Sequence, residues 1–191
     1  MRFSPRFSVL LLSLFLAGCL GGATTPPLAE KGESTRQKAA QLFRECRTQL
    51  ALVEYRKVLH LAQLRDDRPA SANALLNIGV IHLVRGELQE SAHALQQGQK
   101  FFAELQDRQG EQQCATHLAA LTIKRGNWQE GLTALQALWP QLGGDEGSAS
   151  AERVRVLNGM AIAYKESGQL AEAKQCLHRA EQEATALQRE S

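Results

Sequence analysis

A short pattern that recurs at a near-constant interval is the feature that most constrains how this chain folds. It occurs in Gly86–Ser91, Gly126–Gly131 and Gly168–Ala173, and each copy reads Gly, a polar residue, a large apolar residue, a spacer, Glu and a small residue. A leucine follows each small residue by four positions. A nearly fixed period of roughly 40 residues indicates a solenoid, in which each supersecondary unit stacks on the next.

Each unit has the pattern of a helical hairpin. Before each glycine, apolar or small residues recur with spacings of 3, 1 and 3, which places them on one face of a helix. These residues are Leu75, Ile78, Gly79 and His82, then Ala115, Leu118, Ala119 and Thr122, then Leu157, Met160, Ala161 and Tyr164. The glycine is expected to end that helix in the left-handed conformation. Cys46 occupies the same position in a degraded first copy, one period before Gly86. Ser34 with Gln37 predicts a capping box that opens the first helix.

These units resemble the tetratricopeptide repeat (TPR), whose first helix carries Trp/Leu, Leu, Gly/Ala and Tyr and whose second helix carries Ala, Phe/Leu and Ala. The best match is the fourth copy, through Leu157, Met160, Ala161, Tyr164, Gly168, Ala173, Leu177 and Ala180. The period is longer than that of the ordinary TPR, about 34 residues. It is similar to the longer repeats of kinesin light chains, with Leu105–Glu111 in the place of their linking segment. The resemblance implies an all-α, TPR-like right-handed solenoid of about four helix-turn-helix repeats. They are expected at about 33–65, 70–106, 110–142 and 149–189, in a domain of residues 33–191.

Two features are expected near the C-terminal end of the solenoid. The last helix places Leu170, Ala173, Leu177, Ala180, Ala184 and Leu187 in one narrow stripe, as a terminal helix buried on one side should. The glycine-rich segment 142–149 predicts a flexible surface loop between the third and fourth repeats.

The first 19 residues have the pattern of a secretory signal peptide. Arg2 and Arg6 precede an apolar run of about ten residues, which is shorter than the ~20 residues that a helix needs to span a bilayer. The run ends in Leu16, Ala17, Gly18 and Cys19, which resembles the lipobox of bacterial lipoproteins. That resemblance implies cleavage after residue 18 and acylation of Cys19. Because Leu20 stands where an Asp often retains such proteins at the inner membrane, it also implies the outer membrane, facing the periplasm. An ordinary signal peptide with a chance cysteine is the alternative.

Residues 19–32 are predicted to be a flexible tether after the lipidated cysteine, because they are rich in Gly, Thr and Pro and have no apolar period. Pro26-Pro27 is expected to favour an extended path. Removal of residues 1–18 leaves 20 basic side chains (22 − 2) against 20 acidic ones. Nucleic acid is therefore not expected as a partner, because such binding needs a basic surplus. The sequence also has no polybasic patch that could bind a membrane surface, so the lipid alone is expected to hold the protein to the membrane.

No motif in the sequence predicts catalysis, a metal site, a cofactor or a small-molecule substrate. The five histidines are His60, His82, His93, His117 and His178, and none pairs with Cys or acid at a metal-site spacing. His82 stands where the family has Tyr, so a hydrogen-bonded interior role is expected. The three cysteines left after lipidation are Cys46, Cys114 and Cys176. They lie at predicted helical positions in three repeats and are expected to be small buried packing residues, although their odd number leaves a free or intermolecular thiol open.

The TPR resemblance also implies where partners bind, since first-helix residues line the groove of that family. By position the lining residues are Asn73, Leu76, Asn77, Val80, Gln113, Thr116, His117, Ala120, Arg155, Asn158 and Ile162. Asn side chains can hydrogen-bond an extended peptide backbone, but these positions are equally compatible with ordinary exposed helix residues. A carboxylate clamp is not predicted, because Gln113 and His117 stand where Lys and Arg would be needed.

Two hypotheses follow for the function. The first is a non-enzymatic scaffold or adaptor that binds other proteins of the bacterial cell envelope, as TPR lipoproteins do in pilus, secretion or cell-wall assembly. The second is an enzyme or redox protein that uses His117 in the groove or the free cysteines, although the sequence has no CxxC motif to support it. The fold alone does not say which envelope machinery is served.

Overall fold

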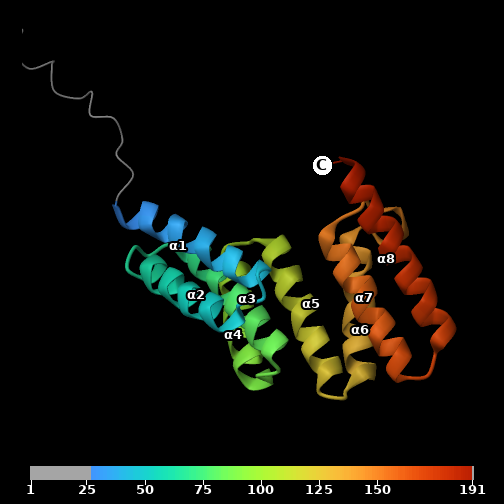
Figure 1. Ribbon diagram of the computed structural model, residues 1–191. Helices are drawn as coiled ribbons and strands as arrows, with labels where there is room; N and C mark the ends of the chain where they lie inside the picture. Colours follow the sequence, from blue (N-terminus) through green and yellow to red (C-terminus); the bar gives the residue numbers. More distant parts are fainter. Residues whose placement is uncertain (1–26, 191) are drawn as a thin grey trace, which may run out of the picture.

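The chain forms a row of paired helices. Its structure is a computed structural model that describes residues 27–190; this part contains eight α-helices, two short 3-10 helices and no strand. The pairs are α1 (Pro27–Arg44) with α2 (Thr48–Gln63), α3 (Arg68–Arg85) with α4 (Leu88–Glu104), α5 (Arg108–Lys124) with α6 (Trp128–Leu138), and α7 (Ala151–Glu166) with α8 (Leu170–Glu190). Figure 1 shows them succeeding one another from α1 at one end to α8 at the other. The predicted all-α TPR-like solenoid of four helix-turn-helix repeats is confirmed.

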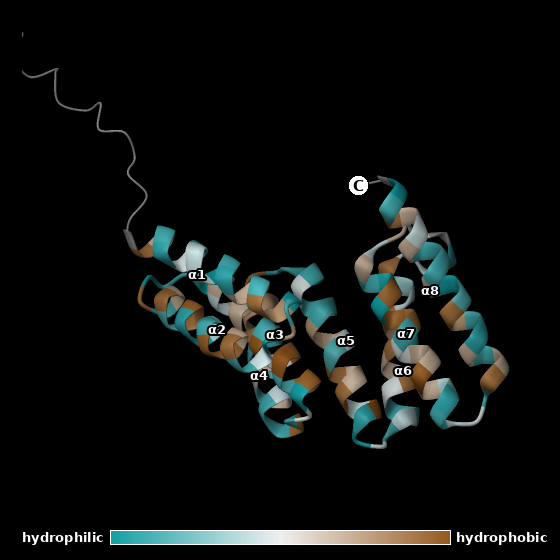
Figure 2. Ribbon diagram, viewed as in Figure 1, coloured by the Kyte–Doolittle hydropathy of each residue, from teal (hydrophilic) through white to brown (hydrophobic). Residues whose placement is uncertain are grey.

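The hydrophobic core runs between the helices as three linked clusters, because each pair buries its apolar face only against its neighbours. In Figure 2 the helices accordingly carry both brown and teal segments. Leu95 and Leu135, which occupy equivalent positions of α4 and α6, are fully buried. The equivalent Leu177 of α8 is 52% exposed and Leu170 is 59% exposed. The predicted stripe of α8 is therefore buried only in part: Ala173 and Ala180 are buried, whereas Leu170 and Leu177 are exposed.

The turns within the hairpins have the predicted left-handed backbone. Gly86, Gly126 and Gly168 have φ values of +80°, +93° and +79°. Cys46, in the degraded first copy, adopts the same conformation with φ +57°. Between repeats, Asp66 and Gln106 have φ values of +52° and +57°. A side chain in this region costs roughly 1–2 kcal/mol, so the first repeat and two inter-repeat turns keep the geometry at the expense of backbone strain.

At these turns, replacing a side chain with glycine should stabilise the fold, and replacing glycine with alanine should destabilise it. We expect Gln106→Gly to stabilise the fold by about 0.5–1 kcal/mol, because relief of strain outweighs the greater freedom of glycine in the unfolded chain. Gly86→Ala should destabilise it by about 1 kcal/mol through backbone strain alone, since a Cβ at Gly86 meets no atom within 4 Å. Urea unfolding followed by circular dichroism measures both changes. Equal urea midpoints for the two variants would show that left-handed backbone strain does not affect stability at these turns.

The first helix begins earlier than predicted. α1 starts at Pro27, so residues 27–32 belong to the folded domain rather than to a flexible tether. Proline is tolerated in the first turn of a helix, where its missing N–H has no partner to lose. The Arg65 guanidinium also donates to the Leu28 carbonyl at 3.2 Å and ties this turn to the end of α2. Ser34 does not open the helix as predicted: it lies inside α1, and its hydroxyl donates to the Lys31 carbonyl at 3.1 Å.

The segment between the third and fourth repeats, predicted to be a flexible surface loop, contains regular turns and is hydrogen-bonded to α7. It forms two 3-10 turns, Pro140–Leu142 and Gly144–Glu146. Arg153 of α7, only 2% exposed, holds them by donating from Nη1 to the carbonyls of Leu142 and Gly144 at 2.8 and 2.7 Å. Buried carbonyls need such partners, so the guanidinium supplies the hydrogen bonds that a regular helix would have made.

Candidate functional site

The predicted groove residues lie on α3, α5 and α7, and we call the surface shared by these three helices the first-helix face. Two of the predicted residues are not available on it. Leu76 is 7% exposed because it packs with Leu95 and Cys114. Thr116 is 3% exposed, and its hydroxyl donates to the Gln112 carbonyl at 2.9 Å. Both are corrected from surface to buried positions.

One cavity of the first-helix face joins all three helices. Its volume is about 460 Å³, and its lining residues are Leu83, Ala120, Ile123, Lys124, Gly126, Gly159, Ile162 and Glu166. Two predicted groove residues, Ala120 and Ile162, contribute to its wall. Ile162 leaves 53% of its surface exposed there, and Lys124 Nζ donates to the Leu83 carbonyl at 3.0 Å, which links two of the walls. The cavity therefore combines an exposed branched apolar side chain with a charged rim.

A second cavity lies nearer the N-terminal end. It measures about 380 Å³ and contains the predicted Asn73 and Asn77 together with Arg36 and Tyr55. The amide nitrogens of the two asparagines donate to main-chain carbonyls of their own helix at 2.9 and 2.7 Å. Their binding of a peptide backbone therefore stays a prediction, with the amide oxygens as the remaining acceptors.

The other predicted residues do not converge on one cavity. Val80 and Gln113 are half-buried. Asn158 lines a separate cavity between α7 and α8. Arg155 Nη2 pairs with Glu152 Oε2 at 2.9 Å, and the other oxygen of Glu152 is buried without a partner in the described part of the chain.

His117 lies among these charges, and burial, assisted by the positive charge of Arg155, lowers the pKa of its imidazole. The neutral ring is thereby favoured. His82 has the hydrogen-bonded interior place that was predicted: it is 5% exposed, and its Nδ1 contacts Glu87 Oε2 at 2.5 Å. Within residues 27–190, no group of three or more His, Cys, Asp and Glu side chains is arranged to hold a metal ion.

The three remaining cysteines differ in environment, although all were expected to be buried helical packing residues. Cys114 fits that prediction, and its burial raises the pKa of the thiol to about 12. Cys176 is half-buried, and burial also raises its pKa. Cys46 is exposed in a left-handed turn, so the prediction was wrong there. All three are free thiols.

Thiol labelling should separate these environments. In a Cys19→Ala background, which leaves three cysteines from the four in the sequence, we expect a maleimide to modify Cys46 rapidly. Cys114 should react only after unfolding, because thiolates are the reactive species and the buried thiol holds its proton. Mass spectrometry of timed samples identifies the labelled sites. Early modification of Cys114 in the native protein would show that its burial is misassigned.

The predicted lipid anchor and lipobox, Cys19 with Leu16, Ala17 and Gly18, lie outside the described residues. Residues 27–190 include no helix whose length and apolarity suit a membrane crossing.

Several solved structures share this arrangement of helices. BtubC (BKLC) from P. vanneervenii superposes with a TM-score of 0.64 at 15% identity, over 84% of this chain and 66% of BtubC, so the chain spans slightly less than two thirds of that protein. A sequence variant of a putative kinesin light chain of Podosopora anserina with nearly identical TPR-like repeats gives 0.61 at 19% identity, over 87% of this chain and 81% of that one.

A second structure of the Podosopora anserina repeats gives a TM-score of 0.59 at 18% identity, with the same coverage of 87% and 81%. No family model and no curated protein matches the sequence. At these identities the likeness establishes the fold and not the activity: the domain is a solenoid of TPR-like repeats.

Proposed function

We propose that this protein is a lipid-anchored scaffold that binds other proteins of the bacterial cell envelope. The observation that carries the proposal is the cavity shared by α3, α5 and α7, where Ile162 is 53% exposed beside a charged rim. Contiguous apolar patches rimmed by polar residues often mark protein-binding surfaces, and Leu83, Ala120, Ile123 and Ile162 line this cavity together. TPR-like solenoids present such surfaces along stacked helices, so the fold and the cavity favour a protein partner.

The membrane attachment rests on the sequence. A charged start, an apolar run and the four residues Leu16–Cys19 favour acylation at Cys19 and, with Leu20 after it, the outer membrane facing the periplasm. Two or three acyl chains hold a protein far more firmly than one. The proposed partners are components of pilus, secretion or cell-wall assembly, as in other TPR lipoproteins.

An enzymatic or redox role has less support. The raised pKa values of Cys114 and Cys176 disfavour reactive thiolates. The charges that act on the imidazole of His117 belong to Arg155 and Glu152, which pair with each other and supply no nucleophile. We therefore propose a non-enzymatic role without a cofactor or a small-molecule substrate.

The binding test compares two matched substitutions in the full chain. Ile162→Asp places a charge in the first-helix cavity, whereas Val53→Asp places one on an exposed part of α2, where Val53 is 39% exposed. After cross-linking in membranes, partners captured by the wild type and by Val53→Asp should be lost with Ile162→Asp. Retention of every partner by Ile162→Asp would overturn the assignment of this cavity.

The anchor test compares the wild type with Cys19→Ala by fatty-acid labelling and membrane fractionation. The wild type alone should take up label and sediment with the outer membrane. An unlabelled wild type in the soluble fraction would remove the membrane from the proposal.

A further inference from the structure

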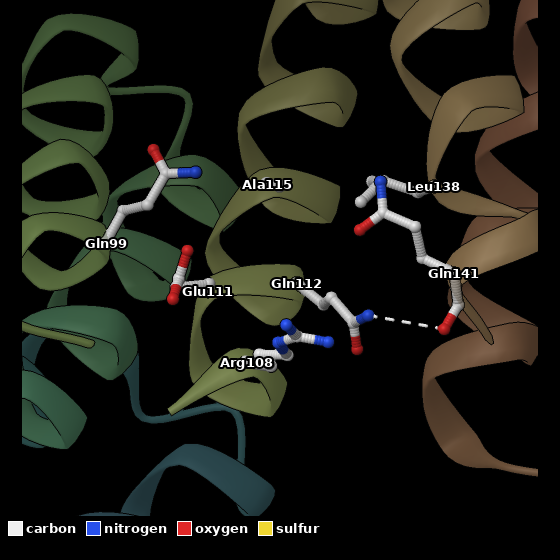
Figure 3. A pocket seen from close by; sticks show the side chains of 7 residues that line it. All are labelled: Gln99, Arg108, Glu111, Gln112, Ala115, Leu138 and Gln141. Atoms are coloured by element: carbon white, nitrogen blue, oxygen red, sulfur yellow. Dashed lines mark hydrogen bonds between the residues drawn. The ribbon is translucent and has the colours of Figure 1, made fainter. Parts of the chain in front are cut away.

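The strongest unassigned feature is a cavity on another side of the solenoid, where α4, α5 and the end of α6 meet. We call it the middle junction; its volume is about 530 Å³. Figure 3 shows its lining side chains, which are Gln99, Arg108, Glu111, Gln112, Ala115, Leu138 and Gln141. Gln99 comes from α4, four residues come from α5, and Leu138 and Gln141 lie opposite. Three of the seven are glutamines, so the cavity is rich in amide groups.

The preceding repeat has an equivalent cavity, the first junction, where α2, α3 and α4 meet. The shift that carries Gly86 onto Gly126 also places Leu59, Arg68, Leu75 and Phe101 of the first junction on Gln99, Arg108, Ala115 and Gln141 of the middle one. In the first junction the Arg68 guanidinium lies 5.5 Å from the centre of the Phe101 ring and pairs with Glu104. This arginine thus finds both an aromatic ring and a carboxylate within the chain.

The junction of the following repeat uses the same kinds of side chain, but its arginine comes from another position, because the shift that relates Gly126 to Gly168 places Arg153 on Glu111. There Arg153 of α7 lies 4.3 Å from the centre of the Trp139 ring. Its guanidinium pairs with Glu183 of α8 at 2.6 Å. In two of the three junctions an arginine therefore finds an aromatic ring and a glutamate within the chain, although a cavity of about 430 Å³ remains at the first junction.

The middle junction lacks each of these partners. The shift that relates Gly86 to Gly126 aligns Phe101 of the first junction with Gln141. The same shift aligns Gln99 with Trp139 of the last junction, so both aromatic positions hold glutamine in the middle junction. Neither of these two glutamates has a counterpart, and the carboxylate that does line the middle junction is Glu111 of α5. Glu104 corresponds to Gly144 by the same shift, and Glu183 corresponds to Gln141 by the shift that relates Gly168 to Gly126.

The side chain of Arg108 is exposed and makes no ion pair or hydrogen bond within the described residues 27–190. Gln112 donates to the Gln141 carbonyl at 3.4 Å, across the cavity (Figure 3). Glu111, three residues from Arg108, is directed toward Gln99 in the same view. The cavity thus presents an unpaired guanidinium at one end and amide groups along its walls.

We infer that the middle junction binds an extended acidic segment of a partner protein. A carboxylate of that segment supplies to Arg108 what Glu104 supplies to Arg68 at the equivalent position of the first junction. The amide of Gln99 can both donate and accept. The amide nitrogen of Gln141 already donates to the Ala137 carbonyl at 3.1 Å, so its oxygen is the remaining acceptor for the main chain of an extended segment. Glu111 accepts a main-chain N–H beside them. This site deepens the proposed scaffold function and rests on it, but it uses a surface separate from the first-helix cavity.

The test uses the full chain in mild detergent and a fluorescein-labelled octapeptide of alternating glutamate and serine. The probe should saturate below roughly 1 mM, while the matched glutamine–serine peptide should not bind. Arg108→Glu should weaken binding by about tenfold or more and confer binding of a lysine–serine peptide. Gln141→Phe, which installs the ring of the first junction, should also block the probe.

The matched control is Arg56→Glu, which reverses an exposed arginine on α2. Binding within about twofold of the wild type is expected for it. Equal losses in Arg56→Glu and Arg108→Glu, or no saturation by the acidic peptide, would overturn the inference. Ile162→Asp distinguishes the two proposals, because it should lose partners at the first-helix cavity and still bind the probe. If Ile162-dependent capture persists while the probe fails, the scaffold function stands and the acidic site falls.

Discussion

Arg153→Met should destabilise the protein by about 3–5 kcal/mol, the range found when one partner of a buried ion pair is removed. Arg153 is 2% exposed, and Glu183 beside it is only 10% exposed. The substitution removes the paired guanidinium, the two hydrogen bonds to the 3-10 turns and the contact with Trp139. Glu183 is left as a buried carboxylate without its counter-charge. Thermal and urea unfolding of the variant should therefore show the largest loss among charged residues.

Arg179→Met is the matched control. Arg179 also stacks on Trp139, at 4.7 Å, but it is 34% exposed and its partner Asp145 is 78% exposed. Exposed pairs contribute about 0–1 kcal/mol, so this variant should stay close to the wild type. The double variant Arg153→Met/Glu183→Leu should recover part of the loss, because no buried charge remains. If Arg153→Met and Arg179→Met were equally stable, the claim that Arg153 closes the last repeat would fail.

The repeat architecture was predictable from sequence because its signals are local. The glycines at 86, 126 and 168 mark left-handed turns, and the register of the repeats found Cys46 in the same conformation despite its side chain. The start of α1 was missed because proline was treated as a helix breaker, although it fits the first turn.

Features that depend on contacts between repeats were not predictable in the same way. Arg153 and Glu183 lie 30 residues apart, and their sequence context is that of ordinary solvated charges. Segment 142–149 has the composition of a loop, and the contacts that hold it come from residues outside it. Arg153 donates to the carbonyls of Leu142 and Gly144, and Trp139 and Arg179 donate to Asp145.

The candidate sites were predicted in part. Carrying TPR positions onto α5 and α7 found Ala120 and Ile162, but placed the buried Leu76 and Thr116 on the surface. On a helix, neighbouring residues in the sequence point in different directions, so an error of one position moves a buried residue onto the predicted surface. The middle junction was missed, although one signal was present: the register aligns Gln99 with Leu59 and with Trp139, so a polar residue interrupts an otherwise apolar position.

The contact between Phe102 and Gly110 gives the second large effect. Phe102 is 1% exposed and packs with Leu95 and Cys114 between the second and third repeats. Phe102→Ala should cost about 3–5 kcal/mol through the lost contacts and the cavity left behind. A Cβ on Gly110 would lie 2.2 Å from the Phe102 ring. Gly110→Ala should therefore destabilise by about 1–3 kcal/mol, even though alanine favours a helix over glycine.

Gly98→Ala provides the matched helical control. A Cβ there lies 3.4 Å or more from its neighbours, which is ordinary contact, so the higher helix propensity of alanine should stabilise by up to about 1 kcal/mol. The stability change on substitution with alanine should thus have opposite signs at Gly98 and Gly110, which sequence alone cannot distinguish. In Gly110→Ala/Phe102→Leu the clash is relieved, and the double variant should lose less stability than the sum of its single changes. Additive losses, or stabilisation by Gly110→Ala, would mean that the ring does not pack on this glycine and that the repeats meet in another register.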